Sequence, residues 1–162
     1  MAETSTKSKK RVLILGASFS YIGCIQETKE MGHEVLVTDR NPEALGLQYA
    51  DIPLTVDITN AECCLKVASE YSIDAVVAVN DFGVKTASFV ARELGLPGIP
   101  PEVARIVTDK YLMRETWRRH NVPSVRYRQV SSPPELKEFL REIGTPAIIK
   151  PFNSSGGGSR GV

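Results

Sequence analysis

Strands and helices alternate along the first part of this chain, and this alternation constrains the fold more than any other feature. Four apolar runs predict β-strands, at residues 11–15, 34–39, 52–56 and 75–79. The first is continuously apolar after Arg11 and ends at Gly16, which is typical of a strand buried on both faces of a parallel sheet. Helices are predicted between the first and second strands, between the third and fourth strands, and after the fourth. We therefore expect an α/β fold with a Rossmann-like parallel sheet.

Helix boundaries are indicated by glycine, proline and capping residues. The helix at residues 21–31 should end at Gly32, and the helix at residues 84–94 at Gly95. Thr59 with Glu62, and Ser132 with Glu135, have the spacing of capping boxes, in which the first side chain accepts a hydrogen bond from the amide three residues later. These two pairs predict the starts of two further helices.

Residues 95–101 form the best domain boundary, since three prolines and two glycines in seven residues cannot continue a helix. We expect a disordered arm at 1–10, a Rossmann-like domain at 11–98 and the start of an α+β domain at 99–162. The second domain should contain helices at 102–107, at 109–120 and after Ser132. It should also contain strands at 126–130 and 147–150.

Composition excludes several classes of protein. The 162 residues carry a net charge of +1, which offers no case for binding nucleic acid or a membrane. No apolar run approaches the roughly 20 residues of a membrane span, and residues 1–10 lack the apolar segment of a secretory signal. Three cysteines, an odd number without metal-binding spacing, are interpreted as reduced thiols. We expect a cytoplasmic protein.

The last residues contain the pattern with the clearest chemistry. A short apolar run ends at Lys150, and a loop of small residues follows. Glycine and serine allow several backbone N–H groups to approach one anion, and a nearby lysine adds a full positive charge. These features predict a phosphate site formed by Lys150, Ser154, Ser155, Gly156, Gly157, Gly158, Arg160 and Gly161.

Three motifs occur in a characteristic order: Thr108-Asp109-Lys110, Asn121-Val122-Pro123, and the run from Ile143 to Pro151 before the glycine-rich loop. With the parallel α/β domain in front of them, they make the chain resemble the ATP-grasp superfamily. The likeness is to its carboxylate–amine ligase branch, which includes biotin carboxylase, carbamoyl-phosphate synthetase and the glycinamide ribonucleotide enzymes. It covers residues 11–162.

The resemblance implies a function. Residues 11–98 would be a pre-ATP-grasp domain, Lys110 and Lys150 would contact the α- and β-phosphates of ATP, and the loop from Ser154 to Gly161 would cover the triphosphate. The enzyme would convert a small carboxylate to an acyl-phosphate for attack by an amine or ammonia, with Mg²⁺ bridging the phosphates. Because the family's metal ligands lie downstream of this loop, we expect no metal ligand or catalytic residue here and no activity from this polypeptide alone.

Polar residues at the ends of the predicted strands add weaker candidates. Asn80 and Asp81 follow the fourth strand, at the sheet edge where ligands bind in open α/β folds. They could orient the acceptor substrate, or serve only in helix capping and turns.

Two other functions remain open at this point. Gly16, Gly23 and Asp39 suggest an NAD(P)-binding domain of an oxidoreductase, although the G-x-G-x-x-G spacing is absent. Alternatively, the chain could be a non-catalytic assembly module that forms a homodimer. The arginines between residues 114 and 128 are interpreted as a solvated helix face rather than as a nucleic-acid surface.

Overall fold

A computed structural model of the chain describes residues 8–144, 146–151 and 160–161. The chain divides into two compact units, residues 1–101 and residues 102–162, and each is described here by itself. In the described part, no helix combines the length and the apolar character needed to cross a bilayer.

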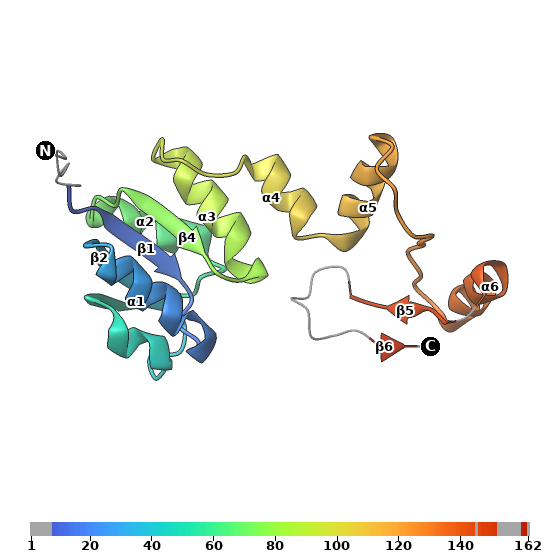
Figure 1. Ribbon diagram of the computed structural model, residues 1–162, viewed down its shortest axis with the longest axis horizontal. Helices are drawn as coiled ribbons and strands as arrows, with labels where there is room; N and C mark the ends of the chain where they lie inside the picture. Colours follow the sequence, from blue (N-terminus) through green and yellow to red (C-terminus); the bar gives the residue numbers. More distant parts are fainter. Residues whose placement is uncertain (1–7, 145, 152–159, 162) are drawn as a thin grey trace, which may run out of the picture. The chain divides into compact units, whose positions relative to one another are not determined.

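The first unit is built on a four-stranded parallel sheet (Figure 1). Its strands are β1 (Arg11–Leu15), β2 (Glu34–Asp39), β3 (Ile52–Thr55) and β4 (Ala75–Ala78), in the order β3-β2-β1-β4. The central strand β1 is in register with both neighbours, so that Ile14 lies between Val37 and Val77. This parallel α/β arrangement confirms the predicted fold class.

Helices cover both faces of this sheet, which explains why β1 is apolar at successive positions. On one face, Val12 and Ile14 pack in a core with Ile25 of α1 (Ile22–Glu30). On the other face, Leu13 and Leu15 pack against α2 (Ala61–Glu70) and α3 (Asp81–Glu93). Figure 1 shows β1 with α1 on one side and with α2 and α3 on the other. Four of the five β1 residues are buried.

The predicted capping boxes had different outcomes. The start of α6 (Pro133–Ile143) is confirmed, since the Ser132 hydroxyl accepts from the Glu135 amide at 3.4 Å. The prediction for α2 was wrong, because Asn60 caps this helix and accepts from the Cys63 amide at 3.1 Å. Thr59 instead donates its hydroxyl to the Asp57 carboxylate at 2.7 Å, which removes it from the helix end.

The described residues of the second unit form three helices and a short hairpin. The helices are α4 (Pro101–Val107), α5 (Lys110–Arg119) and α6, and β5 (Ile148–Ile149) pairs antiparallel with β6 (Arg160–Gly161). The strand predicted at 126–130 is not present. That segment is an irregular stretch whose side chains, rather than a backbone ladder, connect it to α5 and α6.

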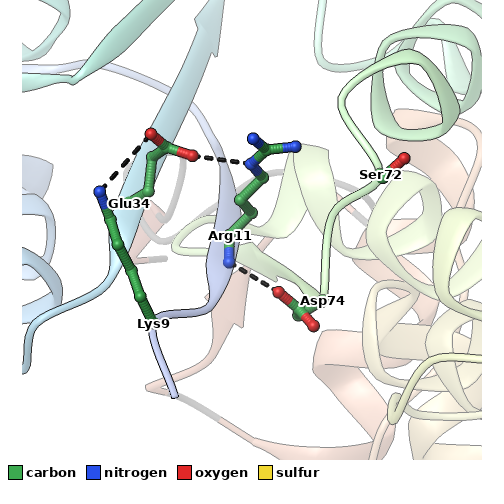
Figure 2. Close-up of a pocket in the computed structure, with 5 residues that line it drawn as sticks. All are labelled: Lys9, Arg11, Glu34, Ser72 and Asp74. Carbon is green, nitrogen blue, oxygen red and sulfur yellow. Dashed lines mark hydrogen bonds and ion pairs between the residues drawn. The ribbon is translucent and has the colours of Figure 1, made fainter.

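A pocket at the amino ends of the strands is lined by four charged residues and Ser72 (Figure 2). Arg11 donates from Nε to Glu34 at 2.7 Å, and its backbone amide donates to Asp74 at 2.8 Å. Lys9 and Lys10 approach the same two carboxylates at 3.6 Å and 3.2 Å. This network joins the starts of β1, β2 and β4, and each of its charges has an opposite charge beside it. We therefore interpret it as structural.

The network predicts a specific pH dependence of stability. The Arg11 amide, and then the Lys10 ammonium, lower the pKa of Asp74 in the folded chain. A carboxyl with a lowered folded pKa stabilises the fold fully above its unfolded pKa of about 3.9 and loses this effect as pH falls through the folded pKa. We expect the stability difference between the native chain and Asp74→Asn to shrink as pH falls from 6 to 3. Urea unfolding at each pH measures this difference, and a difference independent of pH would contradict the assignment.

Candidate functional site

Lys150 lies in the second unit, at the end of a hairpin strand where the chain enters the loop. It follows β5 directly and is exposed. Ile149 pairs with Arg160 across the hairpin, so the backbone of Arg160 and that of Lys150 lie at the same end of the two strands. The predicted loop residues Ser154, Ser155, Gly156, Gly157 and Gly158 lie outside the described residues. The antiparallel pairing of Ile149 with Arg160 places the described residues on either side of this segment next to each other, beside Lys150.

Lys110 is the first residue of α5 and is half-buried. Thr108 and Asp109 before it have structural roles. The Thr108 hydroxyl donates to the Ala104 carbonyl at the end of α4, at 2.8 Å. The Asp109 carboxylate caps α5 by accepting from the amides of Tyr111 and Leu112, both at 2.9 Å. Helix capping thus explains the first two residues of the Thr-Asp-Lys motif, and the resemblance gives the third, Lys110, a phosphate contact.

The two units have opposite net charges. Residues 102–162 include eleven lysines and arginines against six aspartates and glutamates, a formal net charge of +5. Residues 1–101 include nine basic and thirteen acidic residues, a net charge of −4. The near-neutral total therefore conceals a basic unit that contains both Lys110 and Lys150. A positive field of this kind favours an anionic ligand.

Asn80 and Asp81 lie at the carboxyl end of β4, as predicted. The Asn80 side chain accepts from the Gly83 amide at 3.0 Å and so caps α3. A Cβ atom placed on Gly16 would lie 3.0 Å from the Asn80 amide nitrogen, so this side chain reaches the end of β1. Asp81 is exposed in the first turn of α3. Capping explains Asn80 structurally, and its amide also faces the turn after β1.

The residues of the NAD hypothesis have local structural roles. One Asp39 carboxylate oxygen accepts from the Ala17 amide and the other from the Asn41 amide, both at 2.9 Å. A Cβ on Gly16 would lie 2.6 Å from the Tyr21 ring, so that ring closes the turn after β1. Asp39 therefore clamps two turns, whereas a dinucleotide-binding acid must offer its carboxylate to a ribose hydroxyl.

The two hydrogen bonds that Asp39 accepts should contribute to the stability of the fold. Replacing Asp39 with alanine leaves the Ala17 and Asn41 amides without their acceptor, which should cost about 1–3 kcal/mol of unfolding free energy. Chemical denaturation of the two proteins measures this, and Asp39→Asn should recover part of the loss through its remaining oxygen. An unchanged midpoint for Asp39→Ala would contradict the structural role.

Sequence reasoning did not find the contacts of Glu115. Its carboxylate accepts from Arg118 at 2.9 Å and from the Tyr127 hydroxyl at 2.6 Å. These donors, Arg118 first, lower the pKa of Glu115 to about 2. Arg118 lies on the same helix at a spacing of three residues, which the sequence could have indicated. Tyr127 is twelve residues away from Glu115, so no short-range sequence pattern indicates this contact.

The described residues do not supply a metal centre. Within residues 8–144, 146–151 and 160–161, no group of three or more histidine, cysteine, aspartate or glutamate side chains is placed to hold an ion. The described residues therefore do not fit the Mg²⁺ that the resemblance implies.

Comparisons with known proteins show which proteins the chain is similar to. No family model matches the chain. It is 32% identical over 87 residues to the alanine–anticapsin ligase of Bacillus amyloliquefaciens, which covers 54% of this chain and 18% of that protein. It is 30% identical over 163 residues to a formate-dependent phosphoribosylglycinamide formyltransferase of Aliivibrio fischeri, covering 97% of this chain and 41% of that protein. The homologues of this chain are ATP-grasp carbon–nitrogen ligases, and it matches their N-terminal part.

Solved structures agree with this relationship. Phosphoribosylglycinamide synthetase from Anaerococcus prevotii has a TM-score of 0.69 and 28% identity, over 91% of this chain and 38% of that one. More distant structures of the same fold include complexes with ADP. The chain spans 16% to 41% of the lengths of these and similar curated relatives. None of these comparisons supports the oxidoreductase hypothesis.

Proposed function

We propose that the natural polypeptide containing this chain is an ATP-dependent carbon–nitrogen ligase, and that this chain forms part of its ATP phosphate site. In the reaction, a carboxylate oxygen attacks the γ-phosphorus of ATP, so that ADP leaves and an acyl-phosphate forms. An amine or ammonia then attacks the acyl carbon, and inorganic phosphate leaves. Both substrates would be small molecules.

One observation carries the proposal most directly. Strand β5 precedes the glycine-rich segment and β6 follows it, and the two strands pair with each other. The exposed Lys150 directly follows β5. Backbone amides of such a loop, together with a lysine, suit the roughly four negative charges of ATP. The relatives that match the chain are ATP-grasp ligases, and complexes with ADP occur among the structures of similar fold.

Each predicted residue has a proposed role. Lys150 and Lys110 bind and neutralise α- and β-phosphate oxygens, and the loop amides from Ser154 to Gly161 orient the triphosphate, with Arg160 adding positive charge. These groups position ATP and offset its charge, which is the main contribution a protein makes to phosphoryl transfer. Asn80 and Asp81 are proposed to contact the acceptor substrate at the sheet edge. The ligands of Mg²⁺ would come from outside the described residues.

Isothermal titration tests the proposal. Mg·ATP, with NAD as the comparison, is titrated into the longest natural polypeptide that contains this chain and into the 162-residue chain. We expect the long form to bind Mg·ATP and not NAD, with binding weaker in the 162-residue chain. Binding of NAD, or of neither nucleotide by the long form, would overturn the proposal.

A further inference from the structure

Three consecutive residues, Arg126, Tyr127 and Arg128, make contacts with two different helices of the second unit. They lie in the irregular segment between α5 and α6. In an extended chain, alternate side chains point in opposite directions. The two arginines contact α6, and the tyrosine between them contacts α5. We call residues 126–128 the connecting segment.

Arg126 binds the carboxyl end of α6. Its guanidinium donates to the Ile143 carbonyl at 2.8 Å and to the Glu142 carbonyl at 3.3 Å. The last carbonyls of a helix have no partner within the helix, and they form the negative end of its dipole. Two N–H groups of the Arg126 guanidinium bind two of these carbonyls, and its positive charge lies at the negative end of the helix dipole. The helix then stops at Gly144, whose φ of 81° favours glycine, and the chain turns toward β5 and Lys150.

Arg128 holds the same end of α6 through side chains. It forms an ion pair with Glu142, and its guanidinium stacks on the Phe139 ring at 4.8 Å from the ring centre. Two arginines therefore fix the last turn of α6, in which Glu142 and Ile143 lie six and five residues before the start of β5.

Tyr127 contacts α5, the helix that begins with Lys110. Its hydroxyl donates to Glu115 at 2.6 Å, and its ring meets the Tyr111 ring edge-on with centres 6.2 Å apart. Tyr111 follows Lys110 directly and donates its amide to the Asp109 cap. The tyrosine is therefore tied to the first turn of α5 as well as to its middle.

We infer that the connecting segment is a positioning element that sets the two phosphate-binding lysines relative to each other. It links α5, whose first residue is Lys110, with the end of α6, from which the chain passes to Lys150. The inference rests on the proposed function for its ligand, Mg·ATP. Arg126 is the central positioning residue, because its two bonds fix the backbone just before the turn to β5.

Arg126→Met in the longest natural polypeptide tests the inference with two measurements. The first is hydrogen–deuterium exchange of the Ile148 and Ile149 amides without nucleotide, which should become faster when the end of α6 is released. The second is the Kd for Mg·ATP, which should rise roughly tenfold, the size typical of coupling between neighbouring groups. In the Lys150→Ala background, Arg126→Met should have little additional effect, because both changes act through the same lysine.

Two further variants provide matched comparisons. Arg126→Lys keeps one positive donor and should restore part of the affinity. Arg141→Met removes an exposed arginine from the same last turn of α6 and should change neither measurement. Unchanged exchange in Arg126→Met would overturn the inference. Additive effects of Arg126→Met and Lys150→Ala on the free energy of Mg·ATP binding would also overturn it. If Lys150→Ala itself leaves binding unchanged, the proposed function fails, and the exchange measurement still shows whether Arg126 holds β5.

Discussion

Replacing Lys150 with alanine in the longest natural polypeptide should weaken Mg·ATP binding roughly 10- to 100-fold, because a hydrogen bond to a charged group contributes about 1.5–3 kcal/mol. The Lys150 side chain is exposed just after β5, so its removal should leave the fold intact. Isothermal titration measures the loss of affinity. Thermal unfolding without nucleotide should give the same Tm as the native protein.

Lys137→Ala is the matched control for this experiment. Lys137 is also an exposed lysine of the second unit, on α6, and its removal changes the net charge equally. A general electrostatic effect would weaken binding equally in both variants, whereas a direct phosphate contact would weaken it only in Lys150→Ala. Equal effects, or none in Lys150→Ala, would refute the assigned role. Repeating the titration at higher salt should reduce the difference between variants, since the contact is accessible to solvent.

Gly46→Ala should destabilise the first unit by about 1–3 kcal/mol, the usual cost of overpacking a tight site. A Cβ atom at this position would lie 2.7 Å from the carbonyl oxygen of Ala17 and 2.9 Å from its Cα. These are backbone atoms, and the Gly46 amide donates to the same carbonyl at 2.7 Å, so neither partner can move without breaking that bond. Chemical denaturation should show a lower midpoint.

Gly23→Ala offers the opposite case in the same unit. Gly23 lies in α1, and a Cβ atom there would meet nothing within 4 Å. Alanine in a helix loses less conformational entropy on folding than glycine, so this variant should be more stable by up to about 1 kcal/mol. If both variants lost stability equally, the close approach of Gly46 to Ala17 would not be the cause.

The sheet could be predicted because burial on both faces of a strand produces a recognisable sequence pattern. A strand covered by helices on both sides must be apolar at successive positions, and residues 11–15 and 34–39 show this pattern. The prediction of a strand at 126–130 failed for the converse reason. Its pattern matched a strand, but its side chains bind α5 and α6, and the described residues supply no strand to pair with it.

The candidate site was predictable to a different degree in each unit. The loop after Lys150 is predicted to bind phosphate because phosphate binding requires small residues and a cation close together in sequence. Asp39 could not be interpreted from sequence, since its position at the end of a strand suits both a ribose contact and a turn clamp. The choice depends on the Ala17 amide, which is 22 residues away and lies 2.9 Å from the carboxylate.

The sequence by itself determined the fold class and the order of most helices and strands, and it predicts the chemistry of the loop after Lys150. All three depend on patterns that repeat within a few residues, with periods of two or about 3.6, or on residue types needed at adjacent positions. Only the tertiary structure decided that Asp39 accepts from the distant Ala17 amide and that Arg126 binds the end of α6, 16 and 17 residues away. Such contacts form only when folding brings distant segments together, and a hydrogen bond places no periodic requirement on the residues between its partners.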